Sequence, residues 1–461
     1  MDKQTNTSYS SFANEKISRL FWRYALPAII GAVVNTLYNI IDGIFIGHWV
    51  GKEALSGLGI ILPIMNFLAA IGMLVGVGSA SRMSIALGEN NNHFAEKIAG
   101  TSFLLTLLLS GSMMMFIFLF LKPILIFVGA SDVTYPYARD FLQIYLPGGI
   151  FLTLCFNFNN MMRASGYPLK AMITMLISVI ANIILAPIFI LWLGLGMRGA
   201  AMATVLSMMI SFIFVICHFL NKNSDIRLRK ANLKFRWDIV KSIISIGISP
   251  FFIQIAASIV VIFINYQLRK YATLSHVPSD DAIAAFSNVN RLTMLILMVV
   301  VGLTQGMQPI IGYNFGAKNI NRVVETLFYA IKVATLITTI GFVISFFLPH
   351  FLVSLFSPDH ELIALSATAL RYITLAYCLI GFQMVATSFF QCIGMSKQAI
   401  VLSLSRQVLF FLPIVWLLPH WFGLNGIWLA SPVADCLSAG VTALLLFHQL
   451  KRFKCQFKDR R

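Results

Sequence analysis

Asn35-Thr-Leu-Tyr-Asn39-Ile-Ile-Asp42 lies inside the first apolar segment of the chain, which runs from about residue 24 to about residue 50. On a helix, the spacing of Asn35, Asn39 and Asp42 places all three side chains on one face. The segment is long enough to cross a bilayer, where a carboxylate costs roughly 2.5–3.5 kcal/mol on insertion scales unless it is neutralised, paired or hydrated. We therefore predict that Asp42 faces a hydrated cavity and binds a cation or a proton.

The rest of the chain is equally apolar. Of its 461 residues, 58% are hydrophobic and 11% are charged, and the mean hydropathy is +0.83. A typical soluble domain carries about 25% charged residues, so the composition predicts an all-α integral membrane protein. Twelve apolar segments lie near residues 24–50, 55–87, 95–121, 136–163, 169–193, 198–221, 240–268, 281–312, 323–348, 362–392, 398–418 and 424–450.

The placement of Lys and Arg predicts the orientation. The formal net charge is +17, but most basic residues flank the apolar segments, so we expect no nucleic-acid partner. With both termini on the cytoplasmic side, the inner loops hold roughly three times as many basic residues as the outer loops. We therefore predict a multi-pass protein of the plasma (inner) membrane with cytoplasmic termini, surrounded by lipid and monomeric.

Paired landmarks indicate an internal duplication. Gly88-Glu-Asn-Asn resembles Gly316-Ala-Lys-Asn, 228 residues later. Six helices per repeat is an even number, so the two halves insert with the same orientation, and repeats of this kind place a substrate site between them. Three further pairs lie 223 to 228 residues apart: Arg163-Ala-Ser-Gly166 with Gln391-Cys-Ile-Gly394, Gly196-Met-Arg-Gly199 with Gly423-Leu-Asn-Gly426, and Leu26-Pro27 with Ser249-Pro250.

The longest polar break separates the sixth segment from the seventh and divides the chain into two halves. We expect residues 1–23 to form a cytoplasmic arm, 24–221 an N-terminal bundle of six helices, 222–238 a basic linker, 239–450 a C-terminal bundle of six helices, and 451–461 a basic tail.

The C-terminal half carries its own costly residues inside apolar segments. Asp435 lies in the twelfth segment and Arg406 in the eleventh. Each is expensive alone, so they either pair or face the cavity and act on the substrate. Further candidates to line the cavity are Gln254, Asn265 and Arg291. The alternative for each of them is a role in helix packing or on a hydrated surface. Asn265 stands at the repeat position that aligns with Asp42.

An enzyme is not predicted. The six cysteines are scattered, and the eight histidines lie at segment ends or in loops without a metal-binding pair. No glycine-rich lysine motif for ATP is present, so we expect no cofactor.

The stretch Gln308-Pro-Ile-Ile-Gly-Tyr-Asn-Phe-Gly-Ala317 resembles the multidrug and toxic compound extrusion (MATE) family. The first-helix run from Leu26-Pro27 to Asp42-Gly43 and the turn from Arg163 to Gly166 are similar too. The resemblance covers about residues 20–450. It implies a V-shaped bundle of six plus six helices that exports organic cations or drugs, driven by the uptake of H⁺ or Na⁺.

The resemblance also implies a cation site in the N-terminal half. Its acid matches Asp42, its helix-five Asn matches Asn182, and its helix-six Thr matches Thr204. Its helix-four Asn matches Asn157, with the register open to Asn159 and Asn160. These oxygens are a candidate Na⁺ site, but Ala186 stands where the family often has a second acid. Oxygen ligands with net negative charge suit hard cations, so this departure favours protons without excluding a weaker Na⁺ site.

The alternative function is a flippase or exporter of a lipid-linked or metabolite substrate with a similar six-plus-six architecture. A flippase is expected to line its cavity with several basic residues for pyrophosphate, whereas here the candidates are Arg291 and Arg406, accompanied by acids. The mechanism that we predict for the exporter is alternating access by rocking of the two halves.

Overall fold

The computed structural model describes residues 11–274, 277–355 and 359–458, and every regular element in these ranges is a helix. Eleven helices are long and apolar enough to cross a membrane, and a pair bent by 52° supplies a twelfth span. The predicted all-α membrane fold is therefore confirmed. The spans are α2 (Ile17–Trp49), α3 (Lys52–Gly88), α4 (Asn92–Leu119), α6 (Tyr135–Ala164), α7 (Pro168–Pro187) with η1 (Ile188–Trp192), α8 (Gly196–Leu220), α9 (Trp237–Leu274), α10 (Ser279–Gly316), α11 (Ile320–Phe347), α13 (His360–Thr374) with α14 (Tyr377–Cys392), α15 (Ser396–Leu404) with η3 (Ser405–Phe411), α16 (Leu412–Leu417) and α17 (Pro419–Phe422), and α18 (Leu424–Lys458).

Several helices are longer than their apolar segments. α3 has 37 residues, and α9 and α10 have 38 each, which exceeds the length of about 20 residues that a bilayer needs. Acidic residues in their first turns continue these helices beyond the apolar core: Glu53 in α3, Asp238 in α9, and Asp280 and Asp281 in α10. Short elements fill the remaining connections: α5 (Leu121–Phe127), η2 (Lys230–Asn232) and α12 (Pro349–Ser354).

The duplication is visible in the backbone. After α3, Asn90 has a φ of 57° and Asn91 caps α4 by accepting the N–H of Phe94 at 2.9 Å. At the same place in the second repeat, Lys318 has a φ of 58° and Asn319 accepts the N–H of Arg322 at 3.4 Å. Positive φ is uncommon for residues other than glycine, so its recurrence at paired positions marks the same turn built twice.

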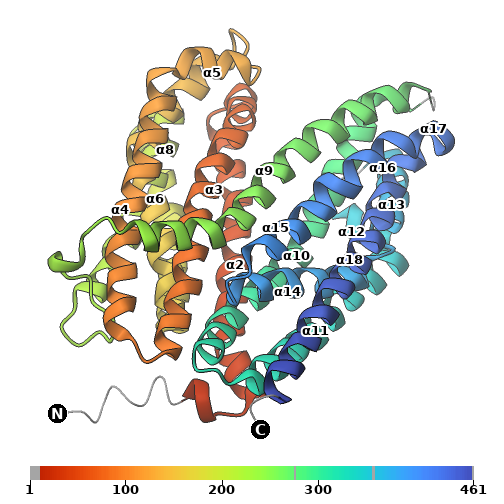
Figure 1. The fold of residues 1–461 in the computed structure, drawn as a ribbon. Coiled ribbons are helices and arrows are strands. Elements are labelled where there is room, and N and C mark those ends of the chain that lie inside the picture. Colours follow the sequence, from red (N-terminus) through yellow and green to blue (C-terminus); the bar gives the residue numbers. More distant parts are fainter. Residues whose placement is uncertain (1–10, 275–276, 356–358, 459–461) are drawn as a thin grey trace.

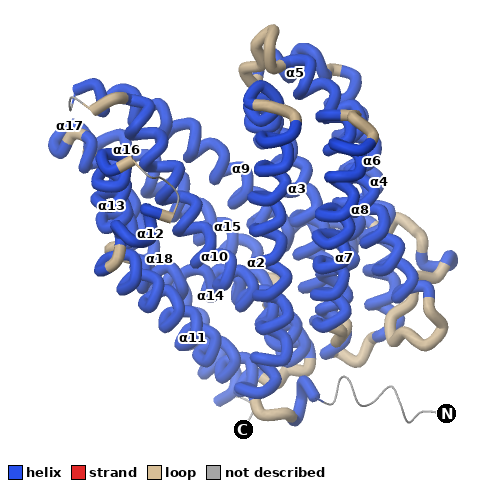
Figure 2. Tube along the Cα trace, turned by 180° about the vertical axis from the view of Figure 1, so that it is seen from behind, coloured by secondary structure: helices blue, strands red, loops and turns tan. Residues whose placement is uncertain are grey.

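The two halves diverge as a V (Figure 1). α2 to α8 form one group and α10 to α18 the other, while α9 begins by crossing in front of the first group and ends in the second. The halves meet at the end where the two chain termini lie and separate toward the end that carries α5 and α17, and the view from behind shows the same shape (Figure 2).

The buried core explains this shape. One hydrophobic cluster contains residues of both halves, which lie near the shared end of the V. A second cluster belongs to the first half and a third to the second half. Because only the first cluster is shared, the halves are held together at one end and packed independently at the other. Members of the shared cluster include Phe12, Leu87, Phe158, Ile243, Ile310 and Phe389.

Glycines let the two halves approach backbone to backbone at the shared end. A Cβ atom added at Gly302 of α10 would lie 2.5 Å from the Cα of Ile29 in α2, and one at Gly306 would lie 2.5 Å from the Cα of Ala25. A Cβ atom added at Gly247 of α9 would lie 1.7 Å from the carbonyl oxygen of Leu74 in α3. Small residues at such crossings are typical of helix packing in membranes.

Residues before α2 reach across to the second half. Phe12 is fully buried, and its ring stacks on Tyr313 of α10 at 5.1 Å between centroids. Arg322 of α11 donates from Nε to the carbonyl oxygen of Phe12 at 3.1 Å and from Nη2 to that of Glu15 at 2.6 Å. The segment Ser11–Glu15 is therefore clamped to the C-terminal half, although α2 belongs to the N-terminal half.

Candidate functional site

Asp42 lies in the outer part of α2, well past the crossing with α10. Its side chain is buried, with 9% of the residue exposed, and its Oδ1 has no hydrogen-bond partner among the described residues. An unpartnered carboxylate oxygen inside a bundle carries a desolvation cost that a bound proton or cation would relieve. Asn35, predicted to share its face, is largely exposed and makes a polar interaction of its own. The side chain of Asn39 lies outside the described part of the structure.

Asn182 and Thr204 meet between α7 and α8. Both are 2% exposed, and Asn182 Nδ2 donates to Thr204 Oγ1 at 3.2 Å. Thr204 in turn donates to the carbonyl oxygen of Ala200 at 3.0 Å. Ala186 is fully buried in the hydrophobic cluster of this half. The polar link between these two helices is therefore neutral, and α7, which carries it, packs against α2, where Asp42 lies.

Asn157 is engaged elsewhere. It is fully buried on α6, where it accepts from Ser79 Oγ of α3 at 2.7 Å. Its Nδ2 donates to the carbonyl oxygen of Ser102 at 3.3 Å and to Thr106 Oγ1 at 3.0 Å, both on α4. These three bonds join α3, α4 and α6 and use both polar atoms of the amide. The neighbouring Asn159 and Asn160 also have partners, the carbonyl oxygens of Ala171 at 2.7 Å and Phe156 at 2.8 Å.

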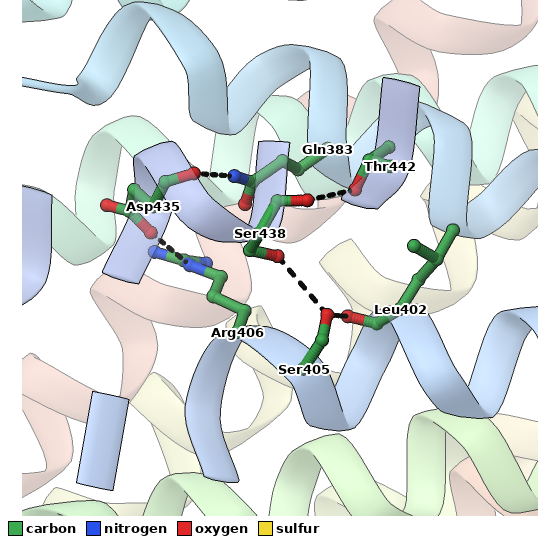
Figure 3. A network of polar contacts seen from close by, with 7 residues as sticks. All are labelled: Gln383, Leu402, Ser405, Arg406, Asp435, Ser438 and Thr442. Atoms are coloured by element: carbon green, nitrogen blue, oxygen red, sulfur yellow. Dashed lines mark hydrogen bonds and ion pairs between the residues drawn. The ribbon is translucent and has the colours of Figure 1, made fainter. Parts of the chain in front are cut away.

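The C-terminal half holds an ion pair inside its bundle (Figure 3). Arg406 Nε in η3 donates to Asp435 Oδ1 in α18 at 2.7 Å, with side-chain exposures of 26% and 2%. Gln383 of α14 donates to the backbone oxygen of Asp435, and the hydroxyls of Ser405 and Ser438 lie 3.3 Å apart. Sequence reasoning named the two charged residues. It missed Gln383, Ser405 and Ser438, which carry no signal that separates them from other polar residues in apolar helices.

The remaining candidates of this half are less constrained. Gln254 and Asn265 on α9 are partly buried and Arg291 on α10 is exposed, and their side chains have no hydrogen bond to the described residues. Sequence reasoning missed Gln267, which is 2% exposed and donates to the carbonyl oxygen of Val415 at 3.2 Å. Gln267 thus fixes α9 to α16, while its neighbours on α9 remain accessible.

A cavity of about 280 Å³ lies between the halves at the shared end of the V. α3 contributes Arg82, the residue after its last turn is Glu89, and α9 contributes Ser242 and Ser245. The cavity lies beside the C-terminal end of α3. Asp42 lies near the opposite end of α3, because it precedes the turn that joins α2 to α3. Over the described residues, no group of three or more His, Cys, Asp or Glu side chains is placed to hold a metal ion. Oxygen donors around Asp42, Asn182 and Thr204 are of the type that Na⁺ accepts.

The sequence profile of the MatE family matches residues 27–188 and 256–417, once in each half. The chain belongs to the MatE family. Its two matched regions begin 229 residues apart, in keeping with the repeat seen in the backbone. MatE proteins are membrane transporters rather than enzymes.

Relatives of this MatE protein cover nearly its whole length. It is 27% identical over 436 residues to "Multidrug export protein MepA" of Staphylococcus haemolyticus, which covers 95% of this chain and 94% of that protein. A solved structure of the MATE multidrug transporter DinF-BH is 37% identical, covers 94% of this chain and 96% of that one, and superposes with a TM-score of 0.87. An outward-facing MATE transporter structure at 24% identity has a TM-score of 0.90, with 98% and 99% covered.

Proposed function

We propose that this MatE protein exports drugs, organic cations among them, by alternating access in exchange for H⁺ or Na⁺. The similarity to MepA, which is named a multidrug export protein, and to DinF-BH, which is named a multidrug transporter, supports the substrate class. The plasma membrane is the expected location, with both termini in the cytoplasm. In that orientation the V opens to the outside, and the cavity at its shared end lies on the cytoplasmic side.

The observation that carries the coupling proposal is the buried Asp42 carboxylate, whose Oδ1 has no hydrogen-bond partner among the described residues. This residue lies on α2, which also makes the glycine-mediated crossing with α10 of the other half at Ala25 and Ile29. A change of charge at Asp42 therefore acts on a helix of the N-terminal half that packs directly against α10 of the C-terminal half. Protons are favoured over Na⁺ because Ala186 removes the second acid and leaves Asn182 and Thr204 as neutral ligands.

In the proposed cycle, residues 24–221 and 239–450 rock as two units joined by residues 222–238, and one polypeptide performs the whole cycle. Binding of the coupling ion at Asp42 from outside and release of drug outward are followed by reclosure and release of the ion inside. A ligand shifts such an equilibrium only through a difference in its affinity for the two states. Protonation of a buried carboxylate supplies such a difference, because the two states hydrate the site differently.

The test is ethidium export from cells or inverted vesicles under an imposed pH gradient and, separately, an imposed Na⁺ gradient. Wild type is expected to respond to one gradient, and Asp42→Asn to reach the membrane but lose that response by at least tenfold. Asp132→Asn is the matched control, because Asp132 is an exposed acid in the loop before α6. An Asp42→Asn variant with undiminished gradient-driven export would overturn the coupling role. Export of no cationic dye by wild type would favour a lipid-linked or metabolite substrate.

A further inference from the structure

The basic linker between the two halves is fastened to α4. Glu96 of α4, with 7% of the residue exposed, pairs with Arg229 Nε at 3.2 Å and accepts from Asn232 Nδ2 at 3.3 Å. A Cβ atom added at Gly100 would lie 2.1 Å from the carbonyl oxygen of Asn232, so the two backbones are in direct contact. The linker therefore keeps one position on the N-terminal half.

This position lies where α4 changes from polar to apolar. Glu96 and Gly100 belong to the second and third turns of α4, within about 12 Å of its first residue at 1.5 Å per residue. The apolar run of α4 begins directly after them, at Phe103. Both views show the linker on the outer flank of the first half, away from the second half (Figures 1 and 2). A segment at that level and on that flank lies beside the lipid headgroups.

Two lysines of the linker are available to bind an anion. Lys230 and Lys234 are exposed, and their side chains have no hydrogen bond or ion pair to the residues that the structure describes. The backbone N–H of Leu233 donates to the carbonyl oxygen of Lys230 at 3.2 Å and closes the turn η2 between the two lysines. One compact turn therefore carries two ammonium groups, each with three N–H donors.

The acidic residues nearby do not neutralise these lysines. Glu96 is buried and paired with Arg229, and Asp225 accepts the hydroxyl of Tyr167 at 2.8 Å. Asp238 is exposed in the first turn of α9, where the free N–H groups of the helix stabilise a carboxylate. The linker holds six basic residues against two acidic ones, so its surface remains positive.

Two exposed aromatic side chains follow the lysines. Phe235 is 47% exposed and Trp237 is 71% exposed, and their ring centroids lie 6.0 Å apart. Tryptophan is enriched at membrane–water interfaces, where its amphipathic ring lies at the level of the headgroups. Basic residues next to a membrane attract anionic lipids. The linker combines both features within eight residues.

We propose that Lys230, Lys234, Phe235 and Trp237 form a binding site for an anionic phospholipid. The phosphate of the headgroup binds the two ammonium groups, and the glycerol and upper acyl chains contact the aromatic rings. A phosphatidylcholine headgroup carries its own cation, which the lysines repel, so the site selects a lipid with a net negative charge. A free phosphate would leave both rings in water. In the orientation proposed above, the lipid comes from the cytoplasmic leaflet.

The experiment measures which lipid stays with the purified full-length chain. The protein in detergent is incubated with equal amounts of phosphatidylglycerol and phosphatidylcholine that share the same acyl chains, and after repurification the retained lipid is quantified by mass spectrometry. Wild type is expected to retain at least about fivefold more phosphatidylglycerol, and Lys230→Gln/Lys234→Gln to lose most of this preference. Lys230→Arg/Lys234→Arg should keep it. Lys122→Gln/Lys270→Gln, which removes two exposed lysines near the other side of the membrane, should leave it unchanged.

Equal retention of the two lipids by wild type overturns the proposal, and so does an unchanged preference in the Lys230→Gln/Lys234→Gln variant. An equal loss in the control variant also overturns it, because any surface lysines would then suffice. Excess inorganic phosphate is expected not to displace the lipid; displacement would assign the lysines to a small anion instead. Trp237→Ala should reduce the retained phosphatidylglycerol several-fold, and full retention would contradict the aromatic contact. Transport is not the readout, so a negative result leaves the proposed function intact.

Discussion

At the scale of single residues, Asn157 and Asp42 show how two polar side chains in the same half serve different ends. Asn157 is fully buried with both of its polar atoms bonded, and it joins three helices. Asp42 is buried with one carboxylate oxygen unpartnered. A satisfied buried amide stabilises the fold, whereas an unsatisfied carboxylate persists at a cost, which is why we propose Asp42 as the residue that binds the coupling ion.

This contrast predicts opposite effects of substitution. Asn157→Ala removes the three hydrogen bonds that join α3, α4 and α6 and leaves a cavity, and it is expected to cost about 1–3 kcal/mol of stability, although Ser79 and Thr106 keep carbonyl partners in their own helices. Its thermal midpoint in detergent should fall, while export per folded molecule keeps its ion dependence. Asp42→Asn should keep or raise the midpoint and lose the ion dependence. An Asn157→Ala protein with a normal midpoint and no coupling would place Asn157 in the ion site instead.

At the scale of helices, packing is decided by glycines at crossings and by local irregularities. α7 runs into the π-helical segment η1 directly after Pro187, and α15 runs into η3 just before Pro413. The two irregular stretches occupy the fifth and eleventh spans, which are equivalent in the repeat. Such segments often lie at functional sites, and here η3 carries Arg406. Proline removes one backbone N–H donor from the helix, so the neighbouring residues can change from α-helical to π-helical hydrogen bonding.

The close crossing of α2 and α10 predicts a steep dependence on side-chain size. In Gly302→Ala, the new Cβ would lie 2.5 Å from the Cα and 2.7 Å from the backbone nitrogen of Ile29. Backbone atoms cannot move aside as a flexible side chain does, so we expect a loss of roughly 1–3 kcal/mol and a lower thermal midpoint. Gly440→Ala in α18 is the control, because a Cβ there meets no atom within 4 Å. Equal midpoints for the two variants would disprove the tight crossing.

At the scale of the whole molecule, the V is held at one end by a shared core and by a segment exchanged between halves. Phe12 inserts beside Tyr313, and Arg322 binds the carbonyl oxygens of Phe12 and Glu15. Thr101 of α4 likewise donates to the carbonyl oxygen of Lys234, in the segment that precedes α9, at 3.1 Å. Each half therefore binds the segment that leads into the first helix of the other half. These hydrogen bonds and ring contacts must break before the halves can separate at the shared end.

We accordingly expect the segment Ser11–Glu15 to stabilise the state in which the two halves are closed at their shared end. Phe12→Ala removes a fully buried side chain whose burial stabilises the closed end by about 1.5–3 kcal/mol. The readout is maleimide labelling of Ser84→Cys in a background lacking the six native cysteines, because Ser84 is fully buried against Gly312 at the junction. Labelling should be several-fold faster in Phe12→Ala. It should be unchanged in Phe127→Ala, whose side chain is 91% exposed. Unaltered labelling in a folded Phe12→Ala protein would contradict this role.

The sequence by itself determined the helices, their order, the duplication and the acid at Asp42. Each of these properties depends on a short stretch of sequence. An apolar segment in a membrane forms a helix because its backbone groups must bond within the segment, and the duplicated turns have similar residues in both halves. It also singled out Arg406 and Asp435, because isolated charges are costly among apolar residues.

Only the tertiary structure decided which polar groups meet. The structure shows that the amide of Asn157 bonds Ser79 and Thr106, while its role at the cation site stays a prediction, and that Arg322 bonds Phe12 across 310 positions. Such contacts depend on the rotation and depth of each helix against its neighbours. Those are fixed by close packing among many side chains at once, and hydropathy along a single segment does not encode them.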